Sequence, residues 1–309
     1  MRVNGVRLGA IDVGTNTTRM LAVEVTPGDL GELDRRLTFT RLGEGVDATR
    51  RITPAAIGRT VSAISEFVAR CRALGVGPIR IAGTSAVREA ANREELRAAV
   101  RAATGLDLEV IPGGKEAALS FAGATQDLPA GRYLVCDIGG GSTELAEGSK
   151  PGQVIEARIS LPLGVVRLTE RHLRDDPPTG EELAALEAGI DSVLDEAAAV
   201  LDDPASRRLV GVAGTVTSLA AIRLGLDRYD PKAVHGSQLT AGEVNDLYRR
   251  LAGMTLRERE ALPPLPVGRA DVIVAGCAIL SRVMARWAFP AVRVSEKDIL
   301  DGLVLELMS

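Results

Sequence analysis

The sequence predicts two α/β domains that arose by duplication, each with a mixed β-sheet, and a cleft between them. The first observation is a repeated motif, because residues 8–18 (LGAIDVGTNTT) match residues 133–143 (YLVCDIGGGST) at an offset of 125 residues. A second match follows in the same order, Ile81–Thr84 with Val212–Thr215. The third observation is that β-like apolar runs alternate with helical stretches in both halves of the chain, as expected of α/β domains.

The first half begins with an apolar run that ends in a turn, and its longest helical stretch carries apolar residues at helical spacing, among them Ile57, Val61 and Ile64. The elements expected there are strands at 7–13 and 20–25, a weaker strand near 37–42, a helix at 54–74, a strand at 79–82, a helix at 92–103, a strand at 107–111 and a helix from residue 115.

The second half repeats this succession. The elements expected there are strands at 132–137, 143–147 and 154–160, a helix at 180–201, a strand at 209–212, further helices, a strand at 291–294 and a final helix from residue 298. That final helix is amphipathic, so we expect it to pack back onto the first domain. The expected domains are therefore 1–126 with about 297–309, and 127–296.

Composition limits the classes of protein to consider. The chain has 309 residues, of which 46% are hydrophobic and 25% charged, a folding composition with room for about two domains. A net charge of −4 and 3% aromatic residues disfavour a nucleic-acid partner. With no run of about 18 apolar residues and no signal-peptide pattern, we expect a cytoplasmic protein with no membrane partner. Three widely spaced cysteines disfavour a disulfide framework or a Cys-rich zinc site.

The duplicated motif carries an aspartate at a strand end with a glycine two residues beyond it, Asp12 with Gly14 and Asp137 with Gly139. Glycines allow backbone N–H groups to converge on phosphate oxygens, and a carboxylate can hold a hydrated Mg²⁺ that binds phosphate. The alternative is a tight turn that needs glycine, with the aspartate bonded to the turn. Because the motif occurs twice, we favour phosphate binding. The further donors in these loops are Thr15, Asn16, Gly140, Gly141, Ser142 and Thr143.

Other common phosphate and catalytic motifs are missing from the sequence. Gly113-Gly114-Lys115 is followed by Glu116, where a Walker-type loop needs Ser or Thr, and no dinucleotide-binding fingerprint follows a strand. His172 and His235 are the only histidines, so a hydrolase of this sequence needs a carboxylate base.

Several motifs together resemble the exopolyphosphatase / guanosine pentaphosphate phosphohydrolase (Ppx/GppA) family. They are Gly9–Asn16, Gly83–Arg88, Leu134–Glu144, Gly211–Thr215, Arg269–Gly276 and Ser295–Gly302. The resemblance implies two ribonuclease H-like domains of the actin/sugar kinase/Hsp70 superfamily. The chain resembles the short, two-domain members, because it lacks the C-terminal helical module with His-Asp character of the longer ones.

The resemblance also implies an activity. The expected reaction is Mg²⁺-dependent hydrolysis of the terminal phosphate of inorganic polyphosphate, a phosphoanhydride hydrolase activity. Alternatives are 5′-phosphate removal from guanosine pentaphosphate, and a catalytically weak sensor that binds polyphosphate or an alarmone such as guanosine tetraphosphate. A sugar-kinase-like phosphotransferase is a further alternative on the same fold. Family resemblance suggests a homodimer.

The family places its catalytic base in a pair of acidic residues before an alanine, and here that segment is Lys115-Glu116-Ala117. The base role therefore passes to Glu116 alone, and Lys115 is a candidate for a phosphate contact. Arg88 is expected to clamp a phosphate, with a surface ion pair to Glu89 or Glu95 as the alternative.

The remaining roles follow from the same resemblance. The expected metal ligands are Asp12, Asp137 and Glu144. The expected phosphate-binding residues are Gly14, Thr15, Asn16, Arg19, Gly139, Gly140, Gly141, Ser142, Thr143, Gly214 and Thr215, with Arg19 facing a nucleotide or a more distant phosphate.

Overall fold

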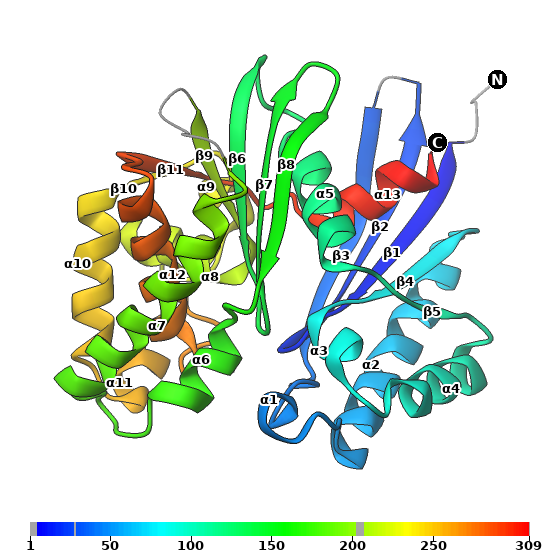
Figure 1. Cartoon of the computed structure of the whole chain (residues 1–309). Coiled ribbons are helices and arrows are strands. Elements are labelled where there is room, and N and C mark those ends of the chain that lie inside the picture. The colour runs from blue at the N-terminus through cyan, green and yellow to red at the C-terminus, as the bar shows by residue number, and fades with distance from the viewer. Residues whose placement is uncertain (1–4, 28, 202–206, 309) are drawn as a thin grey trace. The chain divides into compact units, whose positions relative to one another are not determined.

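The structure, a computed structural model, describes residues 5–27, 29–201 and 207–308. The chain divides into two compact units, Met1–Gly123 with Ile299–Ser309, and Ala124–Asp298, which we call unit 1 and unit 2. Each unit contains one mixed sheet and its own helices (Figure 1).

Unit 1 has a five-stranded sheet in the order β3-β2-β1-β4-β5, in which β1, β2 and β3 are antiparallel neighbours and β4 and β5 run parallel to β1. Its elements are β1 (Val6–Val13), β2 (Thr17–Thr26), β3 (Asp29–Phe39), α1 (Val46–Thr49), α2 (Pro54–Ala73), β4 (Ile79–Gly83), α3 (Ser85–Glu89), α4 (Arg93–Thr104), β5 (Leu108–Val110), α5 (Gly113–Ala124) and α13 (Ile299–Leu307).

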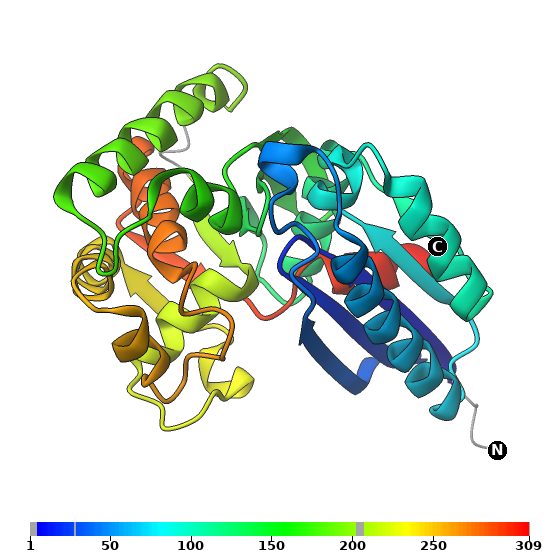
Figure 2. The ribbon, with the colours of Figure 1, turned by 90° about the horizontal axis from the view of Figure 1, so that it is seen from below.

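Alternating side chains of the unit 1 strands enter two separate cores, because successive residues of a strand point to opposite faces of the sheet. Ile11 and Met20 pack with the residues of α2 and α4 on one face. Ala10 and Leu21 pack with Leu303 and the rest of α13 on the other (Figure 2). The C-terminal helix therefore completes the unit 1 core.

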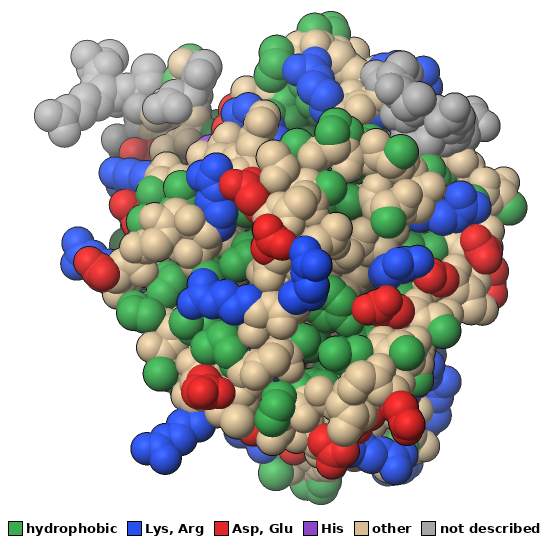
Figure 3. Space-filling view, turned by 90° about the vertical axis from the view of Figure 1, so that its left-hand side faces the viewer, with side chains coloured by type: hydrophobic (Ala, Val, Ile, Leu, Met, Phe, Trp, Pro, Cys, Tyr) green, Lys and Arg blue, Asp and Glu red, His purple; other side chains and the backbone are tan. Residues whose placement is uncertain are grey.

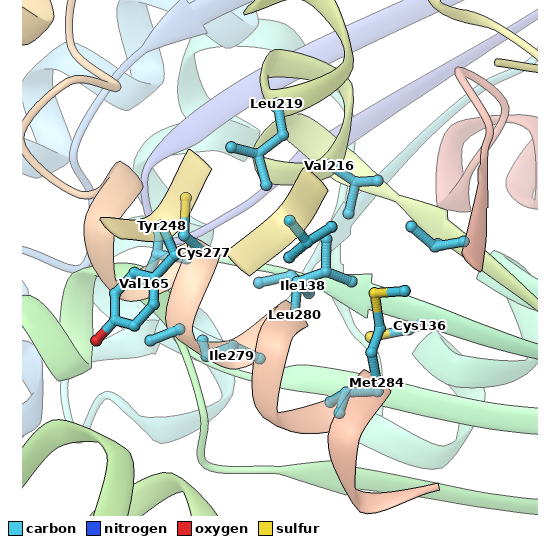
Figure 4. Packing of buried hydrophobic residues seen from close by; sticks show 14 of the residues in the cluster. Cys136, Ile138, Val165, Val216, Leu219, Tyr248, Cys277, Ile279, Leu280 and Met284 are labelled. Carbon is cyan, nitrogen blue, oxygen red and sulfur yellow. The ribbon is translucent and has the colours of Figure 1, made fainter. Parts of the chain in front are cut away.

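Unit 2 has a six-stranded sheet in the order β10-β11-β9-β6-β7-β8. Its elements are β6 (Gly131–Ile138), β7 (Thr143–Lys150), β8 (Val154–Leu161), α6 (Val165–His172), α7 (Gly180–Ala198), β9 (Arg208–Val212), α8 (Ala213–Arg223), α9 (Pro231–Val234), β10 (Gln238–Thr240), α10 (Ala241–Ala252), α11 (Leu256–Glu260), α12 (Ile273–Arg286) and β11 (Ala291–Val294). The core joins strand and helix residues, with Ile138 of β6, Val165 of α6 and Val216 of α8 in one cluster (Figure 4).

The sheets confirm the predicted duplication. The strand order β3-β2-β1-β4-β5 of unit 1 corresponds to β8-β7-β6-β9-β11 of unit 2, with β10 added at the edge. The second sequence match is displaced by one residue, however, since Asp12 lies beside Ala82 and Asp137 lies beside Val212 in the parallel pairs. Ala213 has φ 65° and already begins α8, whereas Ala82, with which it is matched in sequence, still lies in β4.

The strand expected near 37–42 is the one element whose position was clearly wrong. The strand β3 spans Asp29–Phe39, and the chain beyond Thr40 turns away with Arg41 at φ 47°. The charged residues Arg35 and Arg36 interrupt the apolar alternation of this edge strand, and its pairing with β2 also shifts at Ala22/Val23. The pattern therefore underestimated its length.

One face of the molecule shows how side-chain types are distributed on the surface. Basic and acidic side chains are intermixed with apolar ones on the described part of the face in Figure 3. Within residues 5–27, 29–201 and 207–308, no helix is both long and apolar enough to cross a bilayer.

The close packing of α13 against α5 provides a test of the unit 1 core. We expect Gly302→Ala to lower the free energy of unfolding by about 1–3 kcal/mol, because an added Cβ would overlap the carbonyl oxygen of Leu119. The matched control is Gly58→Ala on the exposed face of α2, where a Cβ meets nothing within 4 Å. This control should raise stability by about 0.5–1 kcal/mol. Urea denaturation of both variants measures the difference, and equal midpoints would contradict the packing.

Candidate active site

In unit 1, the carboxyl ends of three parallel strands meet at one edge of the sheet. Val13 of β1 lies beside Gly83 of β4, and Gly83 lies beside Val110 of β5. Two hydrogen bonds continue this alignment past the strand ends, from Thr84 N to Val13 O at 3.2 Å and from Ile111 N to Gly83 O at 3.1 Å. The loops that follow these strands are therefore neighbours, at the edge where open α/β sheets bind ligands.

The structure brings the two predicted catalytic residues of this edge together. Arg88 Nη1 donates to Glu116 Oε2 at 2.8 Å and to Ile111 O at 3.0 Å. Glu116 lies in the first turn of α5 and is only 8% exposed, and buried charges need such a partner. The alternative partners considered for Arg88 are engaged elsewhere, Glu89 by Arg50 and Glu95 by Arg51.

Lys115 points to a different neighbour from Glu116. Its Nζ lies 3.0 Å from Glu306 Oε2 in the last turn of α13, and Arg80 Nη1 lies 2.6 Å from the same oxygen. These two cations hold the pKa of Glu306 below its usual value, against the opposing effect of burial. Lys115 thus links α5 to the C-terminal helix.

The first glycine turn follows β1. Gly14 N donates to Thr17 O at 2.9 Å and closes the turn that connects β1 to β2. Asp12 and Arg19 lie opposite each other in this hairpin, and Arg19 Nη2 and Nε donate to Asp12 Oδ2 at 2.6 and 3.1 Å. The structure therefore gives Arg19 a carboxylate partner within its own unit.

Unit 2 repeats this turn with a different pair of charges. Gly139 N donates to Ser142 O at 2.9 Å, and Asp137 lies opposite Glu144 in the register that Asp12 and Arg19 occupy in unit 1. The two carboxylates are 6% and 2% exposed. Directly opposed residues of an antiparallel pair share one face, so the negative charges are close together.

Further contacts define this acidic pair. Ser142 Oγ and Ser160 Oγ donate to Glu144 Oε1 at 2.8 and 2.6 Å. Burial, followed by the charges of Asp137 and Glu144, raises the pKa of the neighbouring Cys136 thiol.

Among the described residues no group of three or more His, Cys, Asp or Glu side chains is arranged to hold a metal ion. Mg²⁺ does not need such a group, because it is usually held by one or two carboxylates plus waters and phosphate oxygens. The oxygen donors of this pair fit it.

The structure adds a repeated Leu-Gly pair that the sequence analysis missed. In each unit a glycine packs directly behind the glycine turn, since a Cβ on Gly43 would overlap Thr15 and a Cβ on Gly164 would overlap Gly140 and Gly141. The residues before these glycines, Leu42 and Leu163, are buried. The sequence signal is the Leu-Gly dipeptide itself, at an offset of 121 residues, which is too short to recognise without the sheet.

The third predicted phosphate loop follows β9, which runs parallel to β6. Gly214 and Thr215 begin α8 beside the end of that strand. A Cβ on Gly214 would overlap the guanidinium of Arg269, and Arg269 Nη1 donates to Ser218 Oγ at 3.4 Å. Arg269 is therefore a further candidate phosphate-binding residue. It begins one of the motifs that carry the family resemblance, but its contact with Gly214 comes from tertiary packing.

The predicted site residues thus gather at two sheet edges. The unit 1 edge carries Asp12, Gly14, Thr15, Asn16, Arg19, Arg88 and Glu116. The unit 2 edge carries Asp137, Gly139, Gly140, Gly141, Ser142, Thr143, Glu144, Gly214 and Thr215.

Comparison with known proteins agrees with these features. Exopolyphosphatase 2 of Mycobacterium tuberculosis is 38% identical over 316 residues, which cover 97% of this chain and 98% of that protein. The crystal structure of an exopolyphosphatase-like protein is similar with a TM-score of 0.92, 36% identity and 98% coverage of both chains. An exopolyphosphatase from Cytophaga hutchinsonii has a TM-score of 0.89 at 28% identity, and the match covers 98% of this chain and 97% of that one.

The architecture predicted from the duplication, two α/β domains with corresponding mixed sheets, is confirmed. The actin/sugar kinase/Hsp70 superfamily implied by the resemblance and the cleft between the domains stay predictions. Residues 22–309 match the family model described as the Ppx/GppA phosphatase family. With this match and the full-length relatives, the chain belongs to the Ppx/GppA phosphatase family.

Proposed function

We propose that the protein is an exopolyphosphatase, a phosphoanhydride hydrolase that releases terminal orthophosphate from inorganic polyphosphate. The observation that carries the proposal is the ion pair of Glu116 and Arg88 at the carboxyl edge of the unit 1 sheet. The relatives named exopolyphosphatase support this activity over removal of phosphate from guanosine pentaphosphate. The proposal also includes a cytoplasmic homodimer.

In the proposed reaction Glu116 is the general base. Its carboxylate accepts a proton from a water as the water oxygen bonds to the terminal phosphorus. The bond from that phosphorus to the bridging oxygen breaks, and the electron pair stays with the shortened chain. Arg88 holds the carboxylate through Nη1, and its fork of donors is suited to a phosphate oxygen as well.

The glycine turns and the start of α8 form the proposed phosphate-binding groups. The amides of Gly14 and Gly139 close the turns, and the proposed phosphate donors are the backbone N–H groups at 15–16, 140–142 and 214–215. These groups have no charge of their own, and successive N–H groups suit an anion. Arg19, bound to Asp12, reduces the negative charge beside the first turn.

Asp137 and Glu144 are the proposed main ligands of a divalent cation, with Asp12 as a weaker ligand because Arg19 already offsets its charge. When bound, Mg²⁺ neutralises part of the phosphate charge that develops during transfer. Without a cation, two buried carboxylates facing one polyphosphate chain would repel it.

The first test compares substrates. We expect faster orthophosphate release from long-chain polyphosphate than from guanosine pentaphosphate, measured with Mg²⁺ at equal concentrations of terminal phosphate. Faster release from the pentaphosphate would replace the proposed substrate while keeping the same site. Binding of polyphosphate without release would favour a sensor, and transfer only in the presence of an acceptor would favour a kinase.

The second test concerns the base. Glu116→Gln should lower kcat about 10²- to 10⁴-fold, because the amide accepts no proton, with little change in KM. The adjacent control is Lys115→Gln, which should stay within about threefold of the unaltered protein, because Lys115 pairs with Glu306. Near-normal release by Glu116→Gln at saturating Mg²⁺ would remove Glu116 from the role of base.

The third test compares the duplicated aspartates. Asp137→Asn should raise the Mg²⁺ concentration that gives half-maximal activity by about tenfold or more, since it removes one of two facing carboxylates. Asp12→Asn should raise it less, because Arg19 already offsets that charge. Mg²⁺ titrations of phosphate release after treatment with EDTA measure both, and an equal effect of the two substitutions would contradict the assignment.

A further inference from the structure

The first turn of α6 binds three consecutive carbonyl groups of the second glycine turn. Val165 N donates to Gly139 O at 3.0 Å and Val166 N donates to Gly140 O at 2.9 Å. The third carbonyl, Gly141 O, accepts from the side chain of Arg167, whose Nε lies 2.8 Å away. The carbonyls of residues 139–141 are therefore all directed toward α6.

This arrangement determines the direction of the amides of the same turn. In a trans peptide the N–H of the next residue points opposite to the carbonyl, and the only cis peptides in the described residues precede Pro151 and Pro177. The N–H groups of Gly140, Gly141 and Ser142 therefore point away from α6. Successive N–H groups directed to one side form a concave site for an anion.

Unit 1 holds the corresponding carbonyls in another way. Gly43 N donates to Thr15 O at 2.8 Å, and Arg41 N donates to Asn16 O at 2.9 Å. Asn16 is the counterpart of Gly141, so a backbone amide of Arg41 occupies the place that the Arg167 side chain takes in unit 2. In unit 2 the donor to the third carbonyl is thus a side chain, which a substitution can remove.

We propose that Arg167 is a positioning residue for phosphate binding, which acts by holding the Gly141 carbonyl so that the Ser142 amide faces the substrate. The inference rests on the proposed function, because the anion it serves is the polyphosphate chain. Arg167 is 6% exposed, so its guanidinium is within the fold of unit 2. The Nε–H group makes the contact with the Gly141 carbonyl.

Two substitutions separate the donor from the charge. Gln places its Nε2 at the same number of bonds from the backbone as Arg Nε and keeps an N–H donor there without charge. Lys places a methylene at that point and keeps the charge. We expect Arg167→Gln to keep KM for polyphosphate within about threefold, and Arg167→Lys and Arg167→Met to raise it about tenfold, the effect of losing one hydrogen bond to the turn.

Hydrogen exchange provides a measurement that does not depend on activity. The amides of Val165 and Val166 donate to the turn, so they should exchange faster in Arg167→Met and Arg167→Lys than in Arg167→Gln. The matched control is Arg259→Met, because Arg259 is equally buried in unit 2 but donates to Asp176. It should leave both these amides and KM unchanged, whatever it does to stability.

The opposite order of variants would overturn the inference. If Arg167→Lys keeps KM and Arg167→Gln loses it, the charge of Arg167 contacts phosphate directly. If no variant changes the exchange of Val165 and Val166, Arg167 does not position the turn. Absence of phosphate release by the unaltered protein would defeat the proposed function alone, since the exchange measurement still tests the position of the turn.

Discussion

The site residues at each of the two sheet edges depend on a hydrogen bond that closes the turn between the first two strands of that unit. The amide of Gly14 donates to Thr17 O, and the amide of Gly139 donates to Ser142 O, both at 2.9 Å. This bond fixes the hairpin, and the hairpin places Asp12 opposite Arg19 and Asp137 opposite Glu144. Within each turn, the carbonyl groups of residues 15–16 and 140–141 accept hydrogen bonds from donors that lie behind the turn. The charged pair and the amides of each site therefore have a common structural origin.

The two units share this hairpin geometry, but the residue that faces the strand-end aspartate has the opposite charge in each. In unit 1 an arginine faces the strand-end aspartate and binds it within 2.6 Å, so the net charge of the pair is near zero. In unit 2 a glutamate has the same position, and the buried pair carries up to two negative charges. The hydroxyls of Ser142 and Ser160 donate to Glu144 of this second pair. The corresponding positions of the two units therefore differ in charge although their backbone register is the same.

Most elements of the fold could be predicted from the sequence, because each strand or helix leaves a pattern within a short stretch of the chain. Apolar runs ending in Asp-x-Gly marked β1 and β6, and helical spacing marked α2. The prediction failed for β3, where the charged residues Arg35 and Arg36 hide the alternation of an edge strand. Short-range patterns could not reveal contacts made by the sheet itself. Examples are Gly164 behind its turn and Arg269 against Gly214.

The departure of this chain from the family pattern at Lys115 has a structural explanation in the same terms. Successive residues of an α-helix point about 100° apart, so neighbours in the first turn of α5 meet different surroundings. Glu116 meets Arg88, and Lys115 meets Glu306 of α13 at 3.0 Å. A carboxylate at position 115 would face Glu306 as a like charge, with Arg80 left as the cation that pairs with Glu306. The packing of α13 thus favours a cation at position 115, and Glu116 is the one acidic residue in the first turn of α5.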